Sequence, residues 1–239
     1  MGQIWSYSRP ETSSNNTIFP HALHHMKIRT VDDLVKKIAE DRVWRIREIS
    51  MLKRACLNPN SSEREKEVQR RAMIPLAYAH WEGFVKGTGQ NYLNFVASQR
   101  LTLSELAPCF QSIYFSIEMA GELRAEKRYK VVNVLKKLEE DSGNRVHIKT
   151  KGVISTQDNL NSDALRDVCL NLGLGFPSFS NFVPFIDKVL LAKRNCIAHG
   201  ENIFITEENV DEVCSNVVAC IDQFRNEIEN SAVNGTYKR

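Results

Sequence analysis

Apolar residues recur along most of this chain at steps of three and four positions, the spacing that places them on one face of an α-helix. A first helix is expected to begin at Thr30, whose side chain can cap it, with Asp32 and Asp33 at the positive end of the helix dipole. Asn58-Pro59-Asn60 should end it. Its expected buried stripe is Val35, Ile38, Ala39, Val43, Ile46, Ile49 and Leu52.

A second helix is expected from about Ser62 towards Ala97, with Pro75 kinking it or splitting it in two. Tyr78, Glu82 and Lys86 lie four residues apart and therefore share a separate face of this helix. The expected core face is Leu76, Ala77, His80, Trp81, Phe84 and Val85, and we favour a packed, non-catalytic role for His80.

Shorter apolar patterns predict further helices. One follows Pro108, a second ends near Gly143, a third spans about Ser162 to Leu172 with Gly173 as its stop, and the last begins at Thr206. Residues 145–160 alternate loosely and favour a short hairpin or an extended insert. We therefore expect a mainly α helical bundle forming a single domain over 26–230, with a flexible N-terminal arm over 1–25 and a frayed C-terminus over 231–239.

Composition narrows the class of protein. The 239 residues are 42% hydrophobic, enough for a sizeable core, and the net charge of +3 permits an anionic partner without demanding one. We see no run of 18 apolar residues and no signal peptide, so we expect a cytoplasmic protein with no membrane contact. The six cysteines are scattered without a Cys-x-x-Cys pair, which favours reduced thiols and gives no support for a metal or other cofactor.

Chemistry is concentrated where an apolar helix from about Phe182 runs into the stretch Leu190 to Gly200. Arg194, Asn195 and His199 supply a guanidinium, an amide and an imidazole just before Gly200, a natural helix stop. Together they can hold a phosphate and move a proton beside it. The alternative is structural, with Arg194 binding a carboxylate and His199 capping a helix end.

The string Arg-Asn-Cys-Ile-Ala-His-Gly, which begins at Arg194, closely resembles the signature of the HEPN superfamily, whose members are small helical domains and often metal-independent ribonucleases. Residues 79–86, Ala-His-Trp-Glu-Gly-Phe-Val-Lys, resemble the MAE-type HEPN-like nucleases. With these two anchors, the resemblance spans roughly Met26 to Asn230. It implies that two motifs pair across a dimer cleft.

The geometry of the motif helix also bears on this pairing. On a regular helix, Arg194 and His199 are about 140° apart, so they would not share a face. The site therefore needs either a loosened helix end at Gly200 or a second motif, and the resemblance suggests the second motif. Because the chain contains one motif, we expect a homodimer. One His199 would take the proton of an RNA 2′-hydroxyl, the partner His199 would protonate the leaving oxygen, and Arg194 would stabilise charge on the phosphate.

Other residues have two readings. Glu82 either pairs with Lys86 on the surface or faces the cleft and orients Arg194 or His199. Basic residues that could contact RNA are Lys86, Lys193, Arg124, Lys127 and Arg128, although the last three also suit a solvated helix face. The alternative function is a non-catalytic module that binds nucleotide, RNA or protein, and the resemblance also suggests a toxin or defence effector with an antitoxin or other partner protein.

Overall fold

The computed structural model describes residues 27–118, 128–156 and 159–239. The N-terminal arm predicted over 1–25 lies outside these residues. Among the described residues, no helix is long and apolar enough to cross a membrane.

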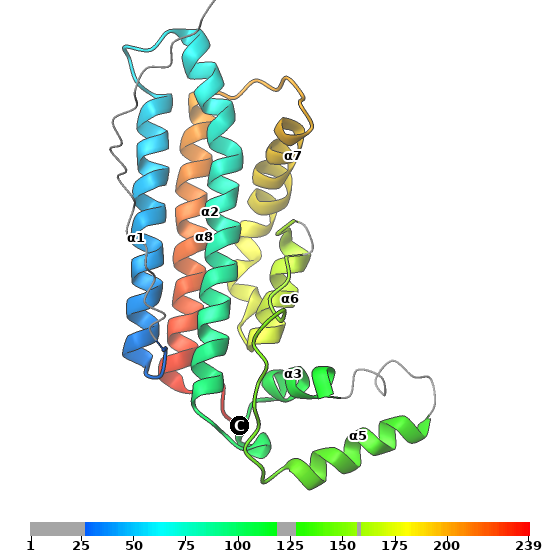
Figure 1. Cartoon of the computed structure of the whole chain (residues 1–239). Coiled ribbons are helices and arrows are strands. Elements are labelled where there is room, and N and C mark those ends of the chain that lie inside the picture. The colour runs from blue at the N-terminus through cyan, green and yellow to red at the C-terminus, as the bar shows by residue number, and fades with distance from the viewer. Residues whose placement is uncertain (1–26, 119–127, 157–158) are drawn as a thin grey trace, which may run out of the picture.

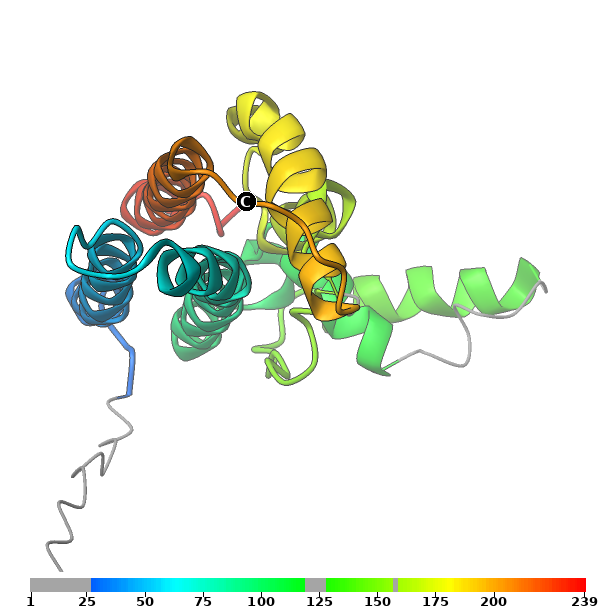
Figure 2. The same ribbon diagram turned by 90° about the horizontal axis from the view of Figure 1, so that it is seen from above.

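Three long helices lie side by side and form the body of the molecule (Figure 1; Figure 2 shows them from above). They are α1 (Val31–Cys56), α2 (Glu63–Ser98) and α8 (Glu207–Asn234). Trp81 of α2 meets Phe224 of α8 edge to face, with ring centroids 6.3 Å apart, and both side chains are fully buried. This contact lies in the main hydrophobic core.

Local sequence sets the helix starts. Thr30 accepts a hydrogen bond from the backbone N–H of Asp33, whose carboxylate accepts one from the backbone of Thr30, so this predicted cap is confirmed. The start near Ser62 and the start at Thr206 are also confirmed, and each has the same reciprocal arrangement, with Glu65 and Asn209 respectively.

The buried faces differ in part from those expected. Leu34, Ile38, Ile49 and Cys56 are the buried residues of α1, whereas Val43 is 53% exposed. On a regular helix Val43 points about 180° away from Leu34, so the expected stripe crossed from the core side to the solvent side. Leu76 of α2 is likewise exposed.

Pro75 does not split α2, which runs through it as one helix. A proline inside a helix removes one backbone hydrogen bond and typically costs about 3 kcal/mol. Ile74 and Ala77, on either side of Pro75, are fully buried. Packing on both sides therefore holds the helix together across the proline.

The remaining elements pack beside and below the long helices (Figure 1). At one end lie η1 (Leu103–Glu105), α3 (Pro108–Glu118) and α5 (Arg128–Asp141). Along the side lie α6 (Ser162–Leu172), η2 (Phe176–Phe182), η3 (Phe185–Leu191) and α7 (Ala192–Ala198). The stop of α6 at Gly173 is confirmed, since Gly173 has the left-handed conformation with φ +68°.

The segment between α5 and α6 is an extended insert, as expected. Its described residues form no hairpin of their own, and Arg145 makes an isolated bridge with Thr102. The C-terminus differs from the frayed end that we expected. Helix α8 continues to Asn234, and Tyr237 is 5% exposed against Phe95, with ring centroids 5.4 Å apart. This aromatic contact fixes the last residues to α2.

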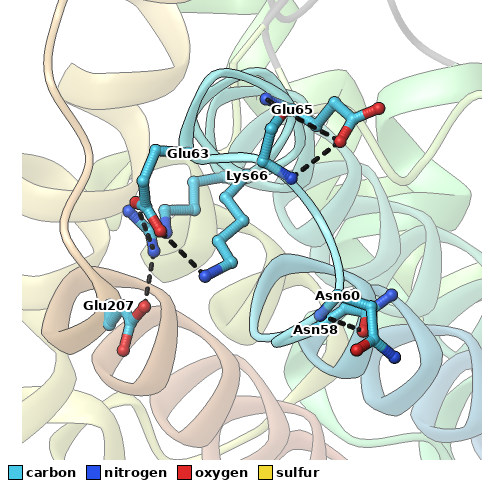
Figure 3. A network of polar contacts seen from close by, with 8 residues as sticks. Asn58, Asn60, Glu63, Glu65, Lys66 and Glu207 are labelled. Carbon is cyan, nitrogen blue, oxygen red and sulfur yellow. Dashed lines mark hydrogen bonds and ion pairs between the residues drawn. The ribbon is translucent and has the colours of Figure 1, made fainter.

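Polar contacts join α2 to α8 at the other end of the bundle (Figure 3). Arg70 of α2 is 6% exposed and donates to Glu207 in the first turn of α8. Lys66 donates to Glu63 at 2.8 Å within the first turns of α2. The ion pair between Arg70 and Glu207 thus holds α8 to α2 at this end of the bundle.

Candidate functional site

The motif helix contains a wide turn before it reaches the polar residues. Residues 185–191 form the π-helix η3, which leads directly into the α-helix α7. Phe185, Ile186 and Leu190 are buried and hold this part against the body. A π-helical turn inside a helix is frequently found at functional sites.

The helix ends where the sequence predicts. Gly200 has φ +81°, and its backbone N–H donates to Ile197 O at 3.0 Å. The N–H of Glu201 donates to Cys196 O at 2.9 Å. These two bonds form the Schellman motif, which satisfies the last carbonyls of a helix and needs a left-handed residue. His199 is therefore presented at the helix terminus, where it is exposed.

Arg194 points inward and is held by neutral groups. Its Nη1 atom donates to Asn159 Oδ1 at 2.7 Å and to Asn195 Oδ1 at 2.8 Å. The guanidinium carbon lies 4.7 Å from the centroid of the Tyr78 ring, a cation–π contact. Within the described residues, Arg194 makes no ion pair with a carboxylate, so the structural alternative of a direct carboxylate partner has no support there.

Asn159 is itself fixed by the insert that crosses α2. Thr156 Oγ1 donates to Glu82 Oε1 at 2.6 Å, and the backbone N–H of Leu160 donates to the Tyr78 hydroxyl at 2.6 Å. The insert is thus bonded to α2 on both sides of Asn159. Helix α2, the insert and α7 form one connected polar site.

Glu82 combines features of both expected readings. It accepts from Lys86 Nζ at 2.8 Å, which is the expected surface pair, but its side chain is only 17% exposed. Burial acts to raise the pKa of Glu82, and the hydrogen bonds from Lys86 and Thr156, with the charges of Lys86 and Arg194, outweigh it and lower the pKa below its usual value. Glu82 is therefore an ionised neighbour of Arg194 rather than its hydrogen-bond partner.

Asn195 connects the two motif residues. Its side-chain oxygen accepts from Arg194, and its main-chain oxygen accepts from the backbone N–H of His199 at 2.9 Å. Among the described residues, the side chains of Arg194 and His199 are not hydrogen-bonded to each other. Arg194 lies within α7, whereas His199 is its C-cap, with φ −86° and ψ 5° outside the helical range.

The other predicted contact residues are dispersed. Lys86 is exposed next to Glu82, and Lys193 is half-buried on α7. Arg124 and Lys127 lie outside the described residues. Arg128 begins α5, which Figure 1 places at the opposite end of the molecule from the end of α7.

His80 is packed, as we favoured. It is 6% exposed, its ring meets the Trp44 ring edge to face at 5.3 Å between centroids, and Nε2 lies 3.3 Å from Glu48 Oε2. In the part of the chain that the structure describes, no cluster of three or more His, Cys, Asp or Glu could hold a metal ion.

Sequence reasoning missed two residues of the site, Thr156 and Asn159. Both come from the irregular insert, whose path over α2 leaves no periodic signal. Tyr78 was placed on the same helix face as Glu82, and that four-residue spacing was the available clue to its position beneath Arg194.

Comparison with known families identifies the family of this chain. The family model RiboL-PSP-HEPN matches residues 40–230, which include α2, the insert and the motif helix. The chain belongs to this HEPN family. No curated protein and no solved structure matches this HEPN chain. The match confirms the superfamily expected from the Arg194–His199 string, whereas the MAE-type branch stays a prediction.

Proposed function

We propose that this HEPN protein is a metal-independent endoribonuclease whose catalytic residues are Arg194 and His199. One observation carries the proposal: among the described residues, the partners that hold the Arg194 guanidinium are two amide oxygens and an aromatic ring. Its positive charge is therefore not cancelled by a direct carboxylate contact within the described residues. Such a guanidinium, five residues before an exposed histidine, suits the binding of a phosphate that gains charge in the transition state.

The reaction needs only groups of this kind. The RNA 2′-oxygen attacks the adjacent phosphorus, so an O2′–P bond forms and the P–O5′ bond breaks. One His199 accepts the 2′-hydroxyl proton, and a second His199 gives a proton to the departing 5′-oxygen. The products are a 2′,3′-cyclic phosphate end and a 5′-hydroxyl end. DNA lacks the nucleophile and is not cut.

Each neighbour has a proposed task. Nη1 of Arg194 makes both hydrogen bonds to the asparagines, so its remaining N–H groups can bind phosphate oxygens. The amide NH2 group of Asn195 can donate to the same phosphate, since its oxygen already accepts from Arg194. Glu82 keeps the insert in place through Thr156.

The second His199 comes from a second copy of the chain in this proposal. Arg194 is directed towards α2 and the insert, whereas His199 is exposed at the end of α7. An exposed histidine at a helix terminus is available to a symmetric partner, and twofold dimers are the commonest oligomers. The homodimer thus supplies both the acid and the base.

The direct test is cleavage of single-stranded RNA in excess EDTA with analysis of the new ends. We expect cyclic phosphate ends from the wild type, and a loss of about 10²- to 10⁴-fold in rate for His199→Ala. Arg194→Lys should also lose activity because a lysine cannot reproduce the fork of donors. Lys36→Ala, at an exposed position of α1 away from the site, is the control and should cleave like the wild type. Activity abolished by EDTA, 3′-hydroxyl ends, or full activity of His199→Ala would each refute the proposal.

We also propose that this activity serves as a toxin or defence effector restrained by a partner protein. The support is the HEPN family together with the exposed position of His199, which a partner could cover. Expression of the wild type should arrest the growth of a host cell, and His199→Ala should not. Equal toxicity of the wild type and His199→Ala would show that the toxicity does not depend on RNA cleavage by His199.

A further inference from the structure

The insert begins with an extended segment of alternating chemistry that the proposed reaction does not use. In residues 145–151 the odd-numbered side chains are exposed, whereas Val146 is half-buried and Ile148 is 3% exposed in the core. Successive side chains of an extended chain point to opposite sides, so Arg145, His147 and Lys149 share one outward face. Lys151 follows them and is exposed in the turn with Gly152. These four outward residues, called here the basic row, are Arg145, His147, Lys149 and Lys151.

The apolar side chains fix the basic row to the body. Ile148 belongs to the main core, and Arg145 bridges to Thr102 at the beginning of the row. After the turn at Gly152, which has φ +78°, Ile154 lies so close to Gly89 of α2 that a Cβ there would be 3.3 Å from its Cδ1 atom. The position of the row is therefore set by the fold.

The same chain then leads to Arg194. From Gly89 the insert follows α2 to Glu82 through Thr156 and to Tyr78 through Leu160. Eleven helical residues from Gly89 to Tyr78 correspond to about 16 Å. Figure 1 shows the insert running beside α2 from the α5 end of the molecule towards α6 and α7. The basic row and the candidate site thus occupy successive parts of one segment.

The charge of the row selects an anionic partner. Residues 145–151 contain no acidic residue, in contrast to α5, where Glu139, Glu140 and Asp141 accompany its basic residues. Alternate residues of an extended chain lie about 6.6 to 6.8 Å apart. A stretched nucleic acid strand presents its phosphates at a comparable interval along its length, and the His147 ring also offers a surface on which a base can stack.

From this arrangement we infer that the basic row binds the backbone of single-stranded RNA and directs the strand to Arg194 and His199. The inference rests on the proposed function and adds that the RNA substrate is single-stranded. A single strand is favoured because it can follow an extended chain, whereas the phosphates of a duplex follow a helix. The row spans about 20 Å, so only an oligonucleotide of several residues contacts both the row and the site.

The test is binding of a fluorescent 2′-O-methyl oligouridine of about twelve residues, which lacks the attacking hydroxyl and stays intact. The variant Arg145→Gln/Lys151→Gln removes the two ends of the row. Because each phosphate contact to a single strand contributes a slope of about 0.7 in a plot of log affinity against log salt, the slope should fall by about 1.4, with affinity about tenfold weaker at low salt. The matched control is Lys36→Gln/Arg47→Gln on the exposed side of α1, which should bind like the wild type.

Equal losses in both double variants, or no loss in Arg145→Gln/Lys151→Gln, would overturn the inference. Stronger binding of a duplex of the same length, or of a polyglutamate peptide, would overturn the choice of single-stranded RNA. Cleavage of a trinucleotide tests the proposed function separately from the basic row, because so short a substrate contacts only the candidate site. Wild type and Arg145→Gln/Lys151→Gln should cut it equally. No cleavage by either would count against the ribonuclease, while the binding assay would still decide the role of the basic row.

Discussion

Arg194 is positioned by oxygen atoms that carry no formal charge. Asn159 and Asn195 accept its hydrogen bonds, whereas the Glu82 carboxylate of the site is bonded to Lys86 and Thr156. A carboxylate in the place of an amide would keep the hydrogen bond but compete with phosphate for the guanidinium. The neutrality of Asn159 is thus a testable property of the proposed active site.

Asn159→Asp should lower RNA cleavage by about tenfold, equivalent to about 1.4 kcal/mol of transition-state stabilisation. The side chain keeps its shape, so the free energy of unfolding should be unchanged or slightly raised by the new ion pair. Steady-state kinetics and urea unfolding measure the two quantities. Asn226→Asp, at an exposed position of α8 outside the site and the basic row, should leave cleavage unchanged. Full activity of Asn159→Asp would show that the charge at this position is irrelevant.

The burial of His80 predicts that the free energy of unfolding depends on pH. Burial lowers its pKa from the ordinary value of 6.5, and the charge of Arg45 acts in the same direction, while Glu48 and Asp41 oppose them. The unfolded chain then binds the proton more readily than the folded one, so this histidine costs no stability above about pH 7. Stability should fall as pH drops through 6.5, by at most about 1.4 kcal/mol per pH unit, until the folded-state pKa is passed.

Urea unfolding of the wild type and His80→Gln at pH 7.5 and 5.5 measures this effect. The wild type should lose more stability between the two pH values than His80→Gln does. His147→Gln, at an exposed position, should behave like the wild type. Identical pH dependence in all three proteins would exclude His80 as the cause.

At the scale of the element, the end of α7 decides where His199 stands. Gly200 has a left-handed backbone with open space around its Cα, since a Cβ there would meet no atom within 4 Å. Gly200→Ala should therefore destabilise the protein through its backbone alone, by about 1 kcal/mol. Any shift of the helix end also moves His199. The cleavage rate should therefore fall by more than the loss of folded protein explains. Thermal unfolding and cleavage rates measure the two effects.

Gly143→Ala is the matched control, because Gly143 also has open space but does not have a positive φ. It should be neutral or slightly stabilising. Equal behaviour of the two alanine variants would mean that the left-handed conformation of Gly200 contributes nothing to the helix end.

The elements were predictable where the decisive interactions are local. Thr30, Gly173, Gly200 and Thr206 act within a few residues of themselves, and each begins or ends a helix as expected. The faces were less predictable, since Val43 and Leu76 depend on which neighbouring helix covers them. Asn159 could not be placed at all, because its contact with Arg194 joins residues 35 positions apart through an irregular segment.

At the scale of the whole molecule, α1, α2 and α8 form a frame against which the motif helix rests. Tyr78 and Glu82 reach the site from α2, which is packed on the other two long helices. Arg194 is thereby tied to the most extensive part of the core. His199, by contrast, is exposed at the end of α7. A rigid arginine and an accessible histidine are what a site shared between two copies of the chain requires.

A shared site makes the activity of mixed dimers predictable. If cleavage needs His199 from both copies, exchange of wild type with an equal amount of His199→Ala should leave about one quarter of the dimers active. Independent monomers would leave the full activity of the wild-type half. The total rate, measured after subunit exchange as the wild-type fraction is varied at constant protein concentration, should therefore follow the square of that fraction. A linear dependence, in a sample shown by light scattering to be dimeric, would mean that each chain supplies both proton transfers and that the proposed pairing of the two motifs is wrong.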